Sequence, residues 1–121
     1  MQKFDNYIVI GDYVEYTPTE NNPRGFVIRA TIMEDTDSSP FDYDCYTEEQ
    51  IKQWENDEWF FYGIVLSVYK AGVCLTNNAA SLWGIECNLP GTSNDYLLDV
   101  IKELETEALQ EGETILQKLI D

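Results

Sequence analysis

The chain has 121 residues, of which 44% are hydrophobic, so we expect a single domain over residues 1–121 with a buried core. Asp and Glu number 23 against 7 Lys and Arg, and the net charge of −16 excludes a basic surface for direct binding to nucleic acid or to an anionic membrane. The absence of histidine excludes Ser-His-Asp and Cys-His nucleophiles and His-ligated metal sites.

The first predicted elements form a β-hairpin. Residues 7–17 and 26–33 are rich in β-branched and aromatic side chains, and apolar positions alternate along both segments. The segment 18–25 between them is dense in Pro, Asn and Gly, which are typical of turns. We therefore expect two antiparallel strands joined by this turn.

An irregular acidic segment, residues 34–46, is followed by the start of a short helix. Thr47 and Gln50 are three residues apart, which is the spacing of a reciprocal capping box. We expect the helix to end near Asn56. Ile51 and Trp54, also three apart, are its predicted buried face.

Residues 59–69 are the strongest predicted strand. Apolar side chains occupy both faces, which is typical of a strand in the interior of a sheet. A turn at residues 70–72 leads into a return strand over 73–86, which Asn77-Asn78 interrupts at a candidate bulge. Pro90-Gly91 ends the sheet.

A long helix is predicted from about residue 94 to 120. Ser93 can cap its first turn, and Asp95 is favourable at the positive end of the helix dipole. Gly112 costs about 1 kcal/mol there relative to Ala and marks a candidate bend. The element order, ββαβββα or ββαββα, predicts an α+β fold: an antiparallel sheet of four to five strands with one short helix and a long C-terminal helix packed on it.

The charge is strongly segregated along the chain. Residues 34–58 hold ten acidic residues and one base, and residues 93–121 hold eight acidic residues and two bases. In the C-terminal helix, acidic residues recur at every fourth position, on an arc of about 160° with roughly 6 Å of axial rise between neighbours: Asp95, Asp99, Glu103, Glu107 and Glu111. The predicted packing face lies opposite this row and consists of Leu97, Val100, Ile101, Leu104, Ala108, Ile115 and Leu119.

A solvated surface is the ordinary explanation for such charge. Like charges at i,i+4 cost a few tenths of a kcal/mol per pair, however, and a helix selected only for stability would intersperse bases. Repeated negative charge resembles a nucleic-acid backbone to a protein that binds one. The alternative is therefore an acidic surface that binds a basic groove.

Other chemistry has weaker support. The loop that contains Asp35-x-Asp37 and Asp42-x-Asp44 lacks the Gly and Glu that an EF-hand requires at its sixth and twelfth positions. Carboxylate pairs arise by chance in so acidic a chain, so a glycosidase is not indicated. No Gly-rich phosphate loop is present. We expect no cofactor, no metal and no enzymatic activity.

The cysteines and the N-terminus indicate the compartment. Cys45, Cys74 and Cys87 form no C-x-x-C pair, which favours a reduced intracellular protein. Cys74 and Cys87 lie in apolar strand patterns and are expected to be buried. Neither a signal-peptide h-region nor an apolar run of roughly 18 residues is present, so we expect a soluble cytoplasmic protein.

Aromatic residues are prominent in the predicted strands. We expect Trp59, Phe61 and Trp83 to lie in the core. An exposed aromatic side chain on the sheet would instead indicate an anchor for a partner.

Several segments follow one another in a specific order: Trp54, Asp57-Glu58-Trp59, Gly63, and Ser81-Leu82-Trp83-Gly84-Ile85-Glu86. With the start of the C-terminal helix, this order resembles a group of short acidic, functionally uncharacterised proteins of bacteriophages and bacteria, over about residues 27–110. The resemblance implies a phage origin and provides no catalytic residues. By class analogy, such proteins are similar in type to anti-restriction and anti-CRISPR inhibitors.

These observations predict a phage-encoded inhibitor of a host defence nuclease, and in particular an anti-CRISPR protein. It would act by stoichiometric binding, with its carboxylates in the basic nucleic-acid-binding groove of a CRISPR effector or restriction enzyme in the host cytoplasm. The alternative is a non-enzymatic phage structural or regulatory protein that binds a partner through its sheet. The candidate partner-binding residues are Asp35, Asp37, Asp42, Asp44, Glu58, Asp99, Glu103, Glu107 and Glu111.

Overall fold

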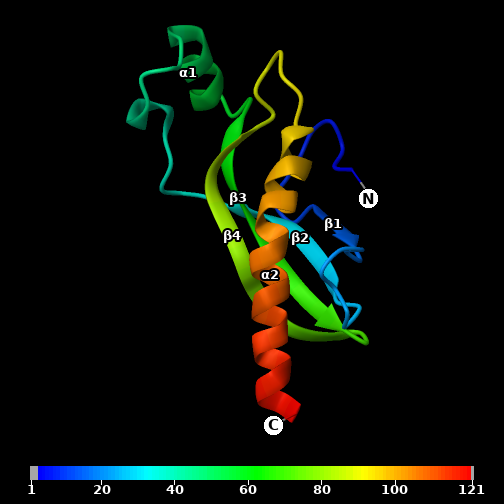
Figure 1. Cartoon of the computed structure of the whole chain (residues 1–121). Coiled ribbons are helices and arrows are strands. Elements are labelled where there is room, and N and C mark those ends of the chain that lie inside the picture. Colours follow the sequence, from blue (N-terminus) through cyan, green and yellow to red (C-terminus); the bar gives the residue numbers. More distant parts are fainter. Residues whose placement is uncertain (1–2, 121) are drawn as a thin grey trace.

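The fold comes from a computed structural model of the chain, and the structure describes residues 3–120 (Figure 1). Over these residues the elements are β1 (Tyr13–Tyr16), β2 (Val27–Glu34), the 3-10 helix η1 (Pro40–Asp42), α1 (Glu48–Glu55), β3 (Phe60–Lys70), β4 (Val73–Cys87) and α2 (Tyr96–Ile120). The strands form one antiparallel sheet in the order β1-β2-β3-β4. The α+β prediction is confirmed, with four strands and the element order ββαββα.

Strand β3 lies inside the sheet, as its apolar faces predict. All residues from 61 to 68 are buried. Strand β4 is continuous, but its register against β3 is irregular: Leu66 pairs with Ala80, whereas Val68 pairs with Thr76. Asn77-Asn78 therefore lies in the bulge that the sequence indicated.

The first predicted strand was too long at its start. Residues 9–12 form a turn, in which the N–H of Asp12 bonds to the carbonyl of Val9 and Gly11 has φ of +95°. Ile8 is fully buried, yet its N–H and carbonyl both bond to the side-chain amide of Asn88 (2.8 and 2.7 Å). A side chain from 80 residues away thus supplies the pairing that a strand ladder would have given.

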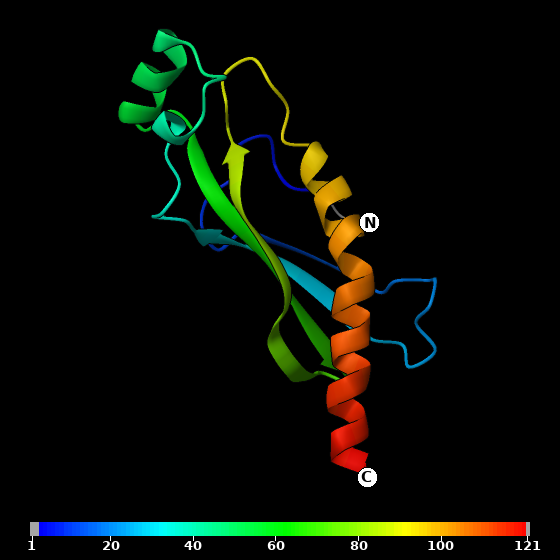
Figure 2. The ribbon, with the colours of Figure 1, turned by 60° about the vertical axis from the view of Figure 1, so that its left-hand side comes forward.

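Helix α2 covers one face of the sheet (Figures 1 and 2). Its buried side chains meet the apolar residues of β2, β3 and β4 in the main core. The Ser93 hydroxyl accepts from the N–H of Asp95 at 3.0 Å, just before the first helical residue. Leu119, which we predicted on the packing face, is 69% exposed in the last turn of α2.

Gly112 marks a close approach of α2 to the sheet, and α2 continues through it as one helix. A Cβ at this position would lie 2.9 Å from Cγ1 of Val68 and 3.4 Å from Cε2 of Phe26. Gly112 is therefore not the bend that the sequence predicts, but a packing site where a larger side chain would collide.

The opposite face of the sheet is covered at one end only. Trp59, Phe61 and Leu89 form a second buried cluster there, with Tyr46 and Trp54 packed against it. The capping box of Thr47 and Gln50 starts α1 as predicted. No residue of α1 is fully buried, and its expected core residues Ile51 and Trp54 are half-buried. Helix α1 is thus a lid on this cluster.

Candidate functional site: acidic surfaces and an uncovered sheet face

The acidic row of α2, which we define as Asp99, Glu103, Glu107 and Glu111, lies on the solvent side of the helix. All four side chains are exposed, as is Asp95 just before the helix. The buried residues of α2 occupy the opposite side: Leu97, Ile101, Glu105, Ala108, Leu109 and Gly112. The fold therefore leaves the predicted row free for contact.

The acidic row has no neutralising partner in the part of the chain that the structure describes. Within residues 3–120, the ion pairs are Arg24–Glu113, Arg29–Glu15 and Lys102–Glu105, and none of them includes a member of the row. Neighbouring carboxylates in the row are separated by roughly 6 Å of helix rise, which is less than the screening length of about 8 Å at physiological ionic strength. The row therefore acts as one extended negative surface.

The predicted partner-binding residues in the acidic segment 34–58 are exposed, with the exception of Asp35. Asp37, Asp42, Asp44 and Glu58 all face solvent. The carboxylate of Asp42 also accepts the N–H of Ser39 and so closes the capping box of η1. These residues are available for contact, although Asp42 has a structural role as well.

Asp35 is a structural anchor. Its carboxylate accepts the N–H groups of Asp37 and Ser38, the Ser38 hydroxyl, and the N–H of Gly84 on β4 at 2.7 Å. Partial burial acts to raise the pKa of Asp35, but these hydrogen bonds together hold it below its ordinary value. The carboxylate therefore ties the acidic loop to the sheet, and few of its lone pairs remain for a partner.

The nine predicted residues fall into two groups. Figures 1 and 2 show α1 and the loop before it beyond one end of the sheet, while α2 runs along the sheet face. The structure therefore brings the row into one surface but does not merge the loop carboxylates with it.

The sequence misjudged two residues of the sheet. Trp83, expected in the core, is 48% exposed, while Trp59 and Phe61 are buried as expected. Cys74 is exposed, and only Cys87 is buried, which raises the pKa of its thiol to about 12. Both errors concern β4, which is an edge strand. The alternation of apolar residues in such a strand does not show which of its side chains other elements cover.

The uncovered part of the sheet holds a stacked cation. The guanidinium of Arg29 on β2 lies 4.6 Å from the ring centre of Tyr13 and 4.9 Å from that of Tyr69. It also contacts Glu15 at 3.4 Å. This part of the face is therefore built from aromatic and amphipathic side chains, and α2 lies on the other face of the sheet (Figures 1 and 2).

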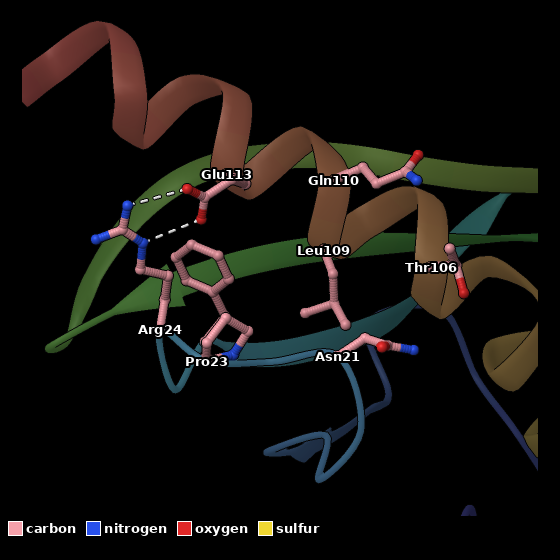
Figure 3. Close-up of a pocket in the computed structure, with 8 residues that line it drawn as sticks. Asn21, Pro23, Arg24, Thr106, Leu109, Gln110 and Glu113 are labelled. Carbon is pink, nitrogen blue, oxygen red and sulfur yellow. Dashed lines mark hydrogen bonds and ion pairs between the residues drawn. The ribbon is translucent and has the colours of Figure 1, made fainter. Parts of the chain in front are cut away.

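A cleft of about 780 Å³ lies between α2 and the loop before β2 (Figure 3). Arg24 and Glu113 close one end through two hydrogen bonds of 3.1 and 3.0 Å. The hydrogen bond from Arg24 holds the pKa of Glu113 below its ordinary value. These two charges satisfy each other, and the lining also includes Phe26 and Leu109, which are only 2% and 6% exposed.

Comparison of the chain with protein-family models, curated sequences and solved structures finds no match. Within residues 3–120, no three His, Cys, Asp or Glu side chains are grouped to hold a metal ion. Among the same residues, no helix combines the length and apolar character that a membrane span requires. The acidic row of α2 and the uncovered sheet face are therefore the features from which a function can be inferred.

Proposed function

We propose that this protein is a phage-encoded, non-enzymatic inhibitor of a host defence nuclease, and specifically an anti-CRISPR protein acting in the host cytoplasm. It binds stoichiometrically, with the acidic row of α2 in the basic groove that normally holds nucleic acid. The observation that carries the proposal is the exposure of the row on the solvent side of α2, without an ion pair in the described residues.

The energetics of groove binding favour such a ligand. A nucleic-acid groove binds through Lys and Arg and gains free energy when condensed counterions are released. CRISPR effectors hold their heteroduplex in a positively charged channel and recognise it through its backbone and shape. A rigid row of carboxylates can pair with the Lys and Arg side chains of such a channel without being a substrate for cleavage.

The test is a charge reversal within the row. Glu103→Lys with Glu107→Lys should lower inhibition at least tenfold, because attraction becomes repulsion at two points of the contact. The Tm should stay level or rise, since repulsion within α2 falls by a few tenths of a kcal/mol per pair. The inhibited nuclease is first identified by pull-down from host extract, and inhibition is then measured as protection of its DNA substrate.

The matched control is Glu20→Lys with Glu55→Lys, which changes the net charge equally at two exposed positions outside the row. It should retain inhibition within about twofold, because screening weakens charges beyond the contact. Full inhibition by the row variant, or equal losses in both variants, would contradict the assignment to α2.

A second candidate function is supported by the uncovered sheet face. Trp83, Tyr13 and Met33 are 48%, 52% and 41% exposed, and an exposed aromatic is a common anchor for a protein partner. A regulatory or structural phage protein could bind through this face. Such binding would be lost on truncation of the exposed aromatic side chains and would weaken less with rising ionic strength than binding through the row, which depends on four exposed carboxylates.

A further inference from the structure

Trp83 is held on the uncovered sheet face by a bulge in β4. Tyr62 pairs with Ile85 and Ile64 pairs with Leu82, so Trp83 and Gly84 together lie opposite Gly63. Gly84 has φ of +72°, a conformation that favours glycine, and its N–H bonds to Asp35 at 2.7 Å. The bulge fixes the backbone from which the indole projects.

The indole lies across Gly63 on the neighbouring strand. A Cβ at Gly63 would fall 2.1 Å from Cε3 and 2.3 Å from Cζ3 of Trp83. Only a glycine therefore lets the six-membered ring rest on β3, and 48% of the residue still faces solvent. Met33 on β2 pairs with Gly63 from the other side and is 41% exposed, so its side chain lies on the same face of the sheet as the ring.

An acidic loop lines a hollow beside the ring. Trp83 lines a hollow of about 310 Å³ together with residues 34–38. Glu34 and Asp37 are exposed there, and neither forms an ion pair within residues 3–120. Asp35 adds a third carboxylate, which stays ionised because its hydrogen bonds lower its pKa. An apolar ring and unneutralised negative charge thus meet in one hollow.

The same face already contains an aromatic site that a cation fills. Arg29 is stacked between the rings of Tyr13 and Tyr69 and contacts the carboxylate of Glu15. Trp83 has a ring and carboxylates but, among the described residues, no guanidinium or ammonium over the ring. Tryptophan is the best aromatic partner for a cation, and Arg is the cation most often found there.

We infer that the hollow beside Trp83 is a docking site for an arginine side chain of a partner protein. The guanidinium stacks on the exposed indole and pairs with Glu34 and Asp37, while its aliphatic stem lies along Met33. The inference rests on the second candidate function, binding through the sheet face, and does not require that the row of α2 bind a basic groove.

The test follows the side-chain indole N–H signals of 15N-labelled protein by NMR during titration with a hexa-arginine peptide. The signal of Trp83 is assigned through Trp83→Phe. We expect it to shift and saturate. The signal of Trp59 should stay fixed, because that ring is buried and its Nε1–H bonds to the carbonyl of Gln50.

A matched pair of variants distinguishes binding at the hollow from nonspecific attraction to the net negative charge of the protein. Glu34→Gln with Asp37→Asn should weaken the binding reported by Trp83 at least fivefold. Glu103→Gln with Glu107→Gln removes the same charge from α2 and should change it less than twofold. A hexa-citrulline peptide, which has the same shape without charge, should leave the Trp83 signal unmoved.

Three results would overturn the inference: a Trp83 signal that does not move with hexa-arginine, equal weakening by both double variants, or an equal shift with the citrulline peptide. Each is distinct from failure of the proposed inhibition. Reversal of the row on α2 tests that function and leaves the residues beside Trp83 unchanged.

Discussion

The phenol of Tyr16 on β1 donates a hydrogen bond of 2.8 Å to Oε1 of Glu105 on α2. Glu105 is only 6% exposed, although it lies among the acidic residues of the most charged helix. Its second oxygen faces Lys102 at 3.4 Å. Burial, followed by the hydrogen bond to Glu105, raises the pKa of Tyr16. The short edge strand and the helix are thus joined by a polar contact within the core.

Removal of the phenolic hydroxyl of Tyr16 should therefore destabilise the fold. Tyr16→Phe leaves a buried carboxylate short of a donor and should lower the free energy of unfolding by about 1–3 kcal/mol. The measurement is urea denaturation followed by circular dichroism. Tyr13→Phe, in a ring that is 52% exposed, is the control and should cost less than about 0.5 kcal/mol. Equal losses in both variants would show that the contact contributes nothing.

Gly112→Ala should destabilise the protein even though Ala is the better helix former. The gain in helix propensity is about 1 kcal/mol. The new Cβ, however, would lie 2.9 Å from the stiff, fully buried side chain of Val68, and such overpacking costs about 1–3 kcal/mol. We expect a net loss on the order of 1 kcal/mol in thermal or urea unfolding. Thr114→Ala, at an exposed position of the same helix, should be neutral or stabilising. A stabilised Gly112→Ala would disprove the close approach.

Gly63→Ala and Trp83→Ala should be coupled. The Ala methyl would collide with the indole, so Gly63→Ala should cost more in the wild type than in the Trp83→Ala background. Gly63 has no positive φ, so the backbone itself tolerates Ala. A double-mutant cycle of unfolding free energies should give a coupling of at least about 1 kcal/mol. Additive effects would mean that the ring does not rest on Gly63.

Asp35→Asn should lower stability most at neutral pH. The folded pKa of Asp35 lies below its unfolded value, so its charge stabilises the fold above the unfolded pKa. That contribution is lost as the pH falls through the folded pKa, because the carboxylate is then protonated in both states. The difference between wild type and variant, measured by urea denaturation at pH 7 and pH 3, should therefore shrink in acid. Asp44→Asn, at an exposed carboxylate, is the control. A difference that grows in acid would contradict the anchoring role.

Much of the secondary structure follows from local sequence. The capping box at Thr47, the tight turn after Lys70 and the two-sided apolar strand β3 each depend on side chains within a few residues of one another. The row of α2 likewise follows from a spacing of four, because helix geometry alone places those residues on one side. For these features the sequence was sufficient.

The remaining features depend on contacts between residues far apart in the chain. Asn88 replaces a strand partner for Ile8, and Glu105 is buried because Tyr16 reaches it from β1. Trp83 lies at the surface because α2 covers the other face of the sheet, and the glycine beneath its ring belongs to another strand. An apolar or charged residue type indicates a preference for burial or for solvent. Only the packed structure decides which neighbour covers or satisfies it.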